Sequence, residues 1–183
     1  MDPNNPAHLM VDIETMGMAP DGAIVQIGYA VFNPITGFVL ASADINVSLA
    51  SSVQAGMTLN PGTIEWWMKQ EQAARDALYT PPPCDLALGL SCIQAVYQNA
   101  QCGAVWAFPA TFDVVILESA FRLTKEKVPW GYRDIRDART WIRQALTREE
   151  CVSTGLKHLA SNDCLNQIRW LMDASRKLNV PLK

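Results

Sequence analysis

Residues 9–17 have the sequence LMVDIETMG, and two acids placed in an otherwise apolar run point to both a fold and a chemistry. A short apolar run of this kind is typical of a buried β-strand. Because side chains alternate along a strand, Asp12 and Glu14 are expected on one face and the apolar residues on the other. Two carboxylates on one face repel each other, and a divalent cation removes that repulsion. The spacing favours a metal site over the alternative, a shorter strand with Glu14 in a solvated loop.

The segments that follow show strand patterns first and then helix patterns. Residues 23–32 form a second apolar run, residues 33–37 are rich in turn formers, and residues 39–47 alternate apolar and polar side chains. Later patterns predict a helix from the Asn60 cap to about Tyr79, a helix at 85–98, a strand at 104–108, a helix at 112–123 and a last helix capped by Ser161 or Asn162. This order predicts an α/β fold, a mixed β-sheet with flanking α-helices, in one domain spanning residues 1–183.

Composition narrows the classes of protein. The 183 residues are 49% hydrophobic and 18% charged, and 15 basic against 18 acidic residues give a net charge of −3. This balance is ordinary for a globular protein and weighs against a processive clamp on duplex DNA, which would usually be basic. No apolar run reaches the ~20 residues of a membrane helix, and the start of the chain at Asp2 lacks the pattern of a signal peptide. We therefore expect a cytoplasmic protein with no membrane partner.

The cysteines and histidines limit the kinds of site. The five cysteines are odd in number and include no C-x-x-C pair, which argues against a disulfide framework and against a zinc ribbon. With only two histidines, a histidine-rich metal site is not available either. We expect reduced thiols that are buried or half-buried.

Two further acids and one histidine are weak signals when taken singly. Asp113 and Asp163 each open a predicted helix, and an acid in the first turn is well explained by the helix dipole. A lone histidine such as His158 is more often a plain surface or core residue than a catalyst. These residues gain weight from their order and spacing together with the acids of residues 9–17.

The combination resembles the three motifs of the DEDD exonuclease superfamily. The motifs are 12–15 (DIET), 112–113 (FD) and His158 five residues before Asp163, at the beginning, middle and end of the chain. The histidine form of the superfamily, DEDDh or DnaQ-like, has this spacing, and Leu159 stands where the tyrosine form would have its tyrosine. Residues 63–70 and 133–137 are similar to a small phage and bacterial subgroup that includes a T4-type phage exonuclease and a mycobacterial exoribonuclease.

This resemblance implies an RNase H-like fold and a metal-dependent 3′-5′ exonuclease. The implied reaction releases nucleoside 5′-monophosphates from the 3′ end of single-stranded RNA or DNA. Two Mg²⁺ or Mn²⁺ ions are implied, with Asp12, Glu14, Asp113 and Asp163 as ligands and Asp12 bridging both ions. His158 is implied as the general base, a task that suits an imidazole near neutral pH. Dimerisation is common among relatives, so a homodimer is allowed.

The resemblance also implies contacts with the substrate. The backbone near Thr15, Met16 and Gly17 is expected to recognise the terminal 3′ hydroxyl, with Met16 wedged against the last base. Trp66 and Trp67 point about 100° apart on a helix, so we expect one in the core and one near the site, where it could stack on a base. The residues expected to bind substrate are Thr15, Met16, Gly17, Trp66, Trp67 and Phe112.

One segment departs from the pattern. Relatives often have a glycine-containing stretch before the third acid, whereas residues 106–113 have the sequence WAFPATFD. Phe108 and Pro109 stiffen and enlarge this loop, which bears on the path of the nucleic acid and on substrate choice. Arg133 and Arg136 could reach phosphates, although a solvated surface position is favoured for Arg136. The choice between RNA and DNA stays open at this stage.

Three other functions are compatible with parts of the pattern. A non-catalytic nucleic-acid-binding module on the same fold would be expected to have lost at least one of the four acids or the histidine, and all five are present. An unrelated nucleotide-binding α/β protein would need a glycine-rich phosphate loop after its first strand, and the sequence has none. An endonuclease of the RNase H type would share fold and metals but would cut a circular single strand.

Overall fold

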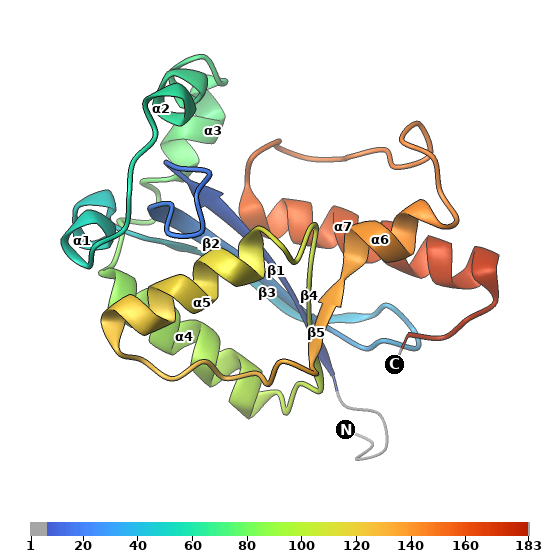
Figure 1. Ribbon diagram of the computed structural model, residues 1–183. Coiled ribbons are helices and arrows are strands. Elements are labelled where there is room, and N and C mark those ends of the chain that lie inside the picture. The colour runs from blue at the N-terminus through green and yellow to red at the C-terminus, as the bar shows by residue number, and fades with distance from the viewer. Residues whose placement is uncertain (1–6, 183) are drawn as a thin grey trace.

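A five-stranded mixed sheet organises the molecule (Figure 1). In the computed structural model, which describes residues 7–182, the strands lie in the order β3-β2-β1-β4-β5. Their bounds are β1 His8–Thr15, β2 Ile24–Phe32, β3 Val39–Asn46, β4 Ala104–Ala107 and β5 Ile135–Asp137. The β1–β2 and β2–β3 pairs are antiparallel, and the β1–β4 and β4–β5 pairs are parallel, as a mixed sheet requires. Residues 1–6 and 183 lie outside the described part, and so do the predictions for Asp2 and for the ends of the domain.

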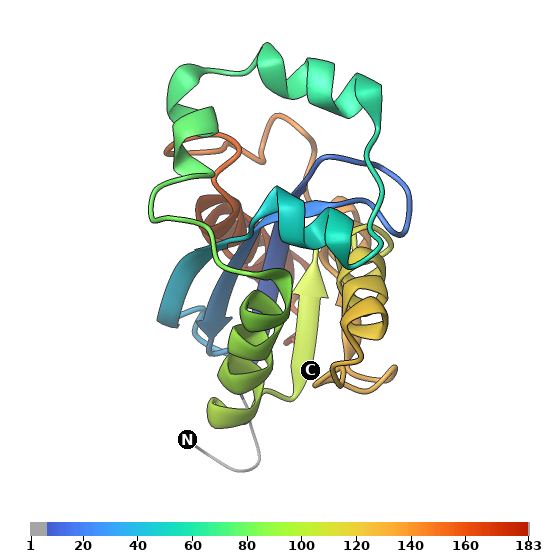
Figure 2. The same cartoon turned by 90° about the vertical axis from the view of Figure 1, so that its left-hand side faces the viewer.

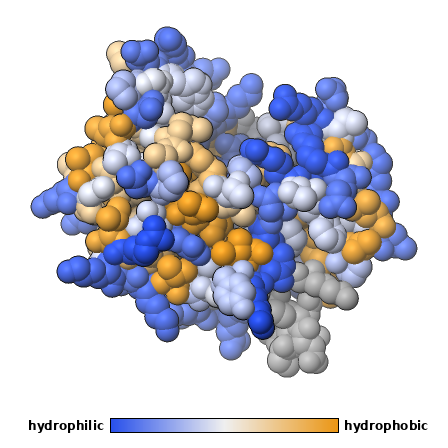
Figure 3. Space-filling model, viewed as in Figure 1, coloured by the Kyte–Doolittle hydropathy of each residue, from blue (hydrophilic) through white to orange (hydrophobic). Residues whose placement is uncertain are grey.

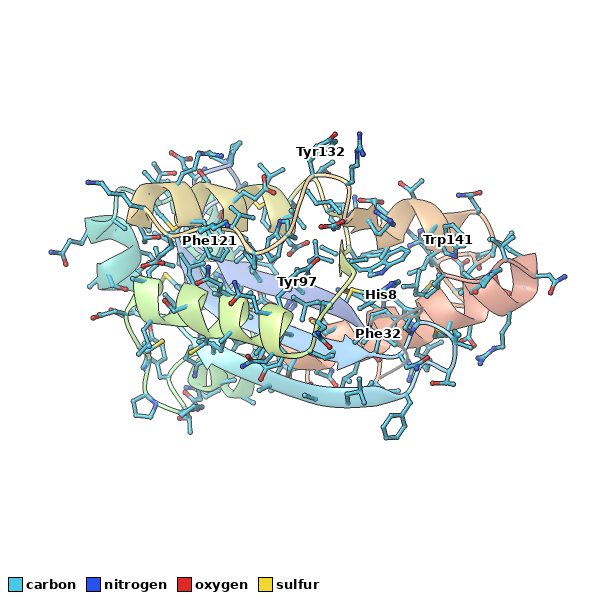
Figure 4. All side chains as sticks on the ribbon, turned by 90° about the horizontal axis from the view of Figure 1, so that it is seen from below. His8, Phe32, Tyr97, Phe121, Tyr132 and Trp141 are labelled. Carbon is cyan, nitrogen blue, oxygen red and sulfur yellow. The ribbon has the colours of Figure 1, made fainter. Side chains whose placement is uncertain are left out.

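Helices cover both faces of this sheet. The larger ones are α4 Leu86–Asn99, α5 Asp113–Thr124 and α7 Ala160–Leu178, with the short α6 Ala138–Arg143 beside α7. One apolar cluster joins the sheet to α4 and α5, and a second joins it to α6 and α7. Figure 4 shows Tyr97 and Phe121 on the α4–α5 side, and His8, Phe32 and Trp141 toward α6 and α7. The predicted mixed sheet with flanking helices is confirmed.

Three short helices connect β3 to α4. They are α1 Leu49–Gln54, α2 Pro61–Met68 and α3 Gln72–Ala77. The Asn60 cap is confirmed, because its side-chain oxygen accepts from the backbone N–H of Thr63 at 3.1 Å. The prediction of a single helix up to Tyr79 is wrong, because the helix is interrupted between α2 and α3. At that break Arg75 Nη1 donates to the carbonyl of Met68 at 2.7 Å, which satisfies one of the acceptors that the end of α2 leaves open.

Two other predictions need correction. The short elements α1, β5 and α6 were missed, because three to six residues are too few to show a periodic pattern. The last helix begins at Ala160, before both of its predicted caps, Ser161 and Asn162. Its N-cap position, Leu159, makes no side-chain hydrogen bond, and partners from the sheet take over that role, as described below.

The last features of the fold are the state of the cysteines and the character of the surface. All five cysteines are free, as predicted, but Cys92 is exposed, so the expectation of a buried or half-buried thiol is wrong for that residue. Between residues 7 and 182, no helix combines the length and apolar character needed to cross a membrane. The face in Figure 3 shows apolar residues gathered over α5, where Val115 and Leu123 are exposed.

Candidate active site

Strand β1 carries the first two acids on the face covered by α7. The apolar side chains of β1 at 9, 11 and 13 enter the core on the α4–α5 side, so Asp12 and Glu14 point to the opposite face. Glu14 is paired with Gln26 of β2, and β1 continues to Thr15. The alternative in which Glu14 lies in a solvated loop is therefore excluded.

Helix α5 begins with Asp113, whose carboxylate meets β1. Asp113 is 3% exposed, and the backbone N–H of Ile13 donates to its Oδ1 at 3.1 Å. Its Oδ2 is buried and has no hydrogen-bond partner among the described residues. Burial raises the pKa of Asp113 to about 7, although the backbone N–H groups of Ile13 and Asp113 oppose the shift. A buried carboxylate oxygen without a partner, beside other acids, suits a bound cation.

Helix α7 reaches these acids through a close approach to β2. A Cβ added at Gly28 would lie 2.2 Å from the carbonyl carbon of Ala160, so any larger residue would push the start of α7 off the sheet. The first N–H groups of α7 are satisfied across this contact. Ala160 donates to Gln26 Oε1 at 3.0 Å, and Ser161 donates to Asp44 Oδ1 at 2.7 Å. The sheet thus caps the helix, which explains why α7 needs no cap of its own.

Gln167 is a residue that the sequence analysis missed. It lies one turn after Asp163 on α7 and is buried. Its Nε2 donates to Asp12 Oδ1 at 2.7 Å, while its Oε1 is buried without a hydrogen-bond partner in the described part of the chain. Gln167 therefore fixes the orientation of the Asp12 carboxylate. The i, i+4 spacing from Asp163 was the available signal.

His158 lies beside two of the acids. One ligand atom each of Glu14, His158 and Asp163 can be chosen so that all three lie within 4.8 Å of one another. The backbone of His158 has φ of +59°, which is uncommon outside glycine, and Gly155 in the same loop has φ of +81°. Asn162 Nδ2 holds this loop by donating to two of its carbonyls, at 2.7 and 3.0 Å.

The carboxylates raise one another's pKa. Burial, followed by the charges of Asp113, Glu14 and Asp163, raises the pKa of Asp12 well above its usual range. Burial, followed by the charges of Asp163 and Asp113, raises the pKa of Glu14 to about 8. Burial also raises the pKa of Asp163, and the neighbouring His158 opposes that shift. So much negative charge in one buried place is costly without cations, and the oxygen-rich set of donors fits hard divalent ions.

These five residues, Asp12, Glu14, Asp113, His158 and Asp163, line one cavity of about 870 Å³. The other lining residues are Ile13, Thr15, Met18, Asn60, Gly62, Thr63, Trp66, Trp67, Phe108, Pro109, Thr111, Phe112 and Arg139. Figure 2 shows α2 and α3 passing across the top of the molecule, above the end of β4. The cavity therefore lies where the ends of the strands, the starts of α5 and α7, and α2 meet.

The two adjacent tryptophans have different surroundings. Trp66 is 42% exposed, and its ring lies edge to face against His158 with 4.8 Å between the ring centroids. Trp67 is 4% exposed, and its Nε1 donates to the carbonyl of Thr15 at 3.0 Å. The expectation of one core tryptophan and one tryptophan near the site is confirmed. Contact of Trp66 with a base stays a prediction.

The remaining predicted substrate contacts divide into two groups. Thr15 and Phe112 line the cavity, whereas Met16 and Gly17 do not. Met16 is buried in the core, its N–H donates to Ala23 at 2.7 Å, and its carbonyl accepts from Asn60 at 2.8 Å. The chain turns after β1, and this turn places exposed Met18 at the cavity instead.

Arg139 is a cation at the site that the sequence analysis missed. Among the described residues that line the cavity, it is the one Lys or Arg. Arg133 and Arg136, which the sequence analysis named, do not line it. Arg133 stacks on the ring of Tyr132, and Arg136 Nη1 donates to backbone carbonyls of its own segment. Helix α6, which carries Arg139, was not predicted.

Comparisons with known proteins agree with this geometry. The family model for the 3′-5′ exoribonuclease Rv2179c-like domain matches residues 7–174, whereas a search of curated proteins gave no match. The nuclease domain of 3′hExo, a DEDDh family member bound to rAMP, is similar with TM-score 0.64 at 11% identity, over 100% of this chain and 99% of that one. E. coli exonuclease I in complex with a dT13 oligonucleotide has TM-score 0.67 at 14% identity, and 95% of this chain covers 42% of that one.

A third structure, cell-death related nuclease 4, has TM-score 0.62 at 15% identity, over 96% of this chain and 64% of that one. At such low identities these structures show the RNase H-like fold alone. The family is shown by its model, which matches most of the sequence and all three motifs. The chain belongs to the family of the 3′-5′ exoribonuclease Rv2179c-like domain.

Proposed function

We propose that this 3′-5′ exonuclease removes nucleoside 5′-monophosphates one at a time from the 3′ end of single-stranded RNA. The observation that carries the proposal is the convergence of four carboxylates and His158 on one cavity. We further propose Asp12, Glu14, Asp113 and Asp163 as ligands of two Mg²⁺ or Mn²⁺ ions. When bound, such ions activate the attacking water and stabilise the charge on the phosphate and the leaving oxygen.

The residues of the chain have distinct tasks in this proposal. Asp12 would hold a cation at the centre of the site, since the charges of the three other acids all act on it. Gln167 holds the Asp12 carboxylate in one orientation through its 2.7 Å hydrogen bond. Asp113 is held by the N–H of Ile13, which leaves its Oδ2 for a cation. Fixed carboxylates place the cations without reorganisation during the reaction.

His158 is proposed as the general base. Its imidazole lies within reach of the two acids that sit closest to it, Glu14 and Asp163, and faces the cavity. An imidazole at this position can accept the proton of the attacking water. The edge of Trp66 limits the positions that the ring can take.

RNA is proposed as the substrate because the family model describes an exoribonuclease. The 3′hExo structure, bound to rAMP, supports this choice. The complex of E. coli exonuclease I with dT13 makes DNA the second candidate. Trp66 is proposed to stack on a base, a contact that is worth ~1–3 kcal/mol and accepts any sequence.

The test compares single-stranded RNA and DNA of one sequence, each labelled at the 5′ end, with Mg²⁺ or Mn²⁺. We expect a ladder that shortens from the 3′ end, faster for RNA, and that disappears with EDTA and in Asp12→Ala and His158→Ala. A circular strand should stay intact. Cleavage of the circle would indicate an endonuclease, and no cleavage of either strand in either metal would favour a non-catalytic binding module.

The predicted homodimer is a separate question. We propose it on the resemblance alone, and the molar mass by light scattering decides it. A mass near 20.2 kDa across the working concentrations would exclude the dimer, and a doubled mass would support it.

A further inference from the structure

The cavity has an aromatic group on each side of the acids. On one side, Trp66 packs against His158, which precedes α7. On the other side lies Phe108, whose ring packs against Trp170 with 6.0 Å between the centroids. Trp170 comes seven residues after Asp163, which is two turns and about 10 Å farther along the same face of α7. The acids therefore lie between two places that can hold a base.

The second aromatic group also carries a positive charge. The guanidinium carbon of Arg139 lies 5.2 Å from the centroid of the Phe108 ring. The loop of Phe108 is fastened to the start of α6, because Asp137 accepts from the N–H of Ala110 at 2.8 Å and from that of Thr140 at 2.7 Å. Phe108 and Arg139 thus come from two elements that are tied together.

No salt bridge neutralises the charge of Arg139 within residues 7–182, and its guanidinium forms no hydrogen bond there. The guanidinium packs on the ring of Phe108, and its positive charge opposes the rise in the pKa of Asp113. Arg139 is exposed and lines the cavity beside the acids. Asp137, two residues earlier, is already used by the two N–H groups named above. A cation kept at the edge of an acidic cavity is suited to an anion that arrives with the substrate.

The chemistry of the reaction identifies that anion. The scissile phosphate must lie at the acids, so the two nucleosides that it joins extend to opposite sides. The terminal nucleoside ends in a free 3′ hydroxyl and has no other phosphate. The nucleotide before it has a 5′ phosphate of its own. The side of the cavity that Arg139 lines therefore fits the strand, and the side at Trp66, which no Lys or Arg lines among the described residues, fits the terminal nucleoside.

We propose that Phe108, Arg139 and Trp170 form a binding subsite for the nucleotide next to the 3′ end, with Arg139 contacting that nucleotide's own 5′ phosphate. This inference rests on the proposed exonuclease function. The proposal also explains why Phe108 stands where relatives often have a glycine-containing stretch, because its ring is the surface on which the base or the guanidinium packs.

The test uses two strands of five ribonucleotides with the same sequence. In one, the second phosphate from the 3′ end is replaced by a neutral methylphosphonate, and the third nucleotide from the 3′ end is 2′-deoxy in both strands so that no hydroxyl attacks the methylphosphonate. The rate of removal of the first nucleotide is measured for both, and the ratio of the rates reports the contact with that phosphate. The variants are Arg139→Gln, Phe108→Leu and the control Arg143→Gln, an exposed cation one turn farther on α6 that does not line the cavity.

For the wild type and Arg143→Gln, we expect the first nucleotide to be removed about tenfold faster from the strand with the charged phosphate than from the methylphosphonate strand. Arg139→Gln should lose most of that preference. Phe108→Leu should slow both strands by about fivefold and keep the ratio. An unchanged ratio in Arg139→Gln, or no preference in the wild type, would overturn the subsite while leaving the exonuclease intact. A wild type that removes no nucleotide from the natural strand would instead overturn the proposed function, and the subsite with it.

Discussion

The site has a floor and a rim that are built in different ways. The floor consists of Asp12, Glu14, Asp113 and Gln167, which project from regular strands and helices and are mostly tied by hydrogen bonds. The rim consists of Trp66, Phe108 and His158, which come from a short helix and two loops and make mainly aromatic contacts. The charges that bind cations need fixed positions, whereas the rim must admit a strand and release a product. We therefore expect substitutions in the floor to affect catalysis and cation binding, and those of Trp66 and Phe108 in the rim to affect substrate binding.

The largest effect is expected in the floor, for Asp113→Asn. Asparagine keeps an oxygen for the N–H of Ile13 but removes the charge. Loss of a cation ligand removes several kcal/mol of transition-state stabilisation, so we expect kcat to fall by about 10³-fold or more. Single-turnover rates at saturating Mg²⁺ measure this, with circular dichroism as the control for folding. Activity within tenfold of the wild type would show that Asp113 is not a ligand.

His158→Asn tests whether the histidine belongs to the floor or to the rim. Asparagine tolerates the positive φ at this position, so the loop should keep its shape. For a general base we expect kcat to fall by about 10²- to 10⁴-fold while the Mg²⁺ dependence stays unchanged. Because His158 lies close to Glu14 and Asp163, a clear loss of Mg²⁺ affinity would instead make it a ligand.

A smaller effect in the floor is expected for Gln167→Met, which has a similar volume and cannot donate to Asp12. Such neighbours of a ligand typically contribute 10- to 100-fold to metal affinity, so we expect the Mg²⁺ concentration for half activity to rise by about tenfold. The rate at saturating Mg²⁺ should fall much less, because all the ligands remain. An unchanged Mg²⁺ requirement would mean that Gln167 serves packing alone.

The same contrast explains what the sequence could predict. The floor follows from strand alternation and from a three-motif pattern, so Asp12 and Glu14 could be placed on one face before the fold was known. The rim depends on short elements such as α6, which are too short to show a period and whose positions tertiary contacts decide. Arg139 was missed for this reason, and Met18 was missed because tertiary contacts also decide the course of the turn after β1. Gln167 was missed because its i, i+4 spacing from Asp163 is a weak signal, shared by any two residues one turn apart on a helix.

Substitutions of the two adjacent tryptophans should affect different properties, substrate binding for Trp66 of the rim and stability for the buried Trp67. We expect Trp66→Leu to raise KM for the strand by about fivefold with little change in the free energy of unfolding, because Trp66 is exposed and stacking on a base is lost. Trp67→Phe should instead lower the free energy of unfolding with little change in KM. It removes a buried indole and its hydrogen bond to Thr15, which costs about 1–3 kcal/mol of stability. Equal effects on KM would contradict the assignment of the two rings.

The smallest effect on activity, and the sharpest test of the floor, concerns stability without divalent ions. Burial, followed by the charges of Asp163 and Asp113, raises the pKa of Glu14 to about 8, and burial raises the pKa of Asp113 to about 7. Between the ordinary and the raised pKa the folded chain holds more protons than the unfolded chain, so the free energy of unfolding is highest in mild acid and falls as the pH rises to about 8, by at most about 1.4 kcal/mol per pH unit and group.

Urea unfolding in EDTA across this range measures the slope, and Glu14→Gln should flatten it, since the glutamine does not titrate. Saturating Mg²⁺ should remove the slope in the wild type, because the ions bind the ionised carboxylates and take over the role of the protons. A slope that Mg²⁺ leaves unchanged would mean that these carboxylates are buried together for a reason other than cation binding. If Mg²⁺ abolishes the slope in the wild type and the slope is already shallow in Glu14→Gln, the pH dependence of stability arises from the proposed cation ligands of the floor.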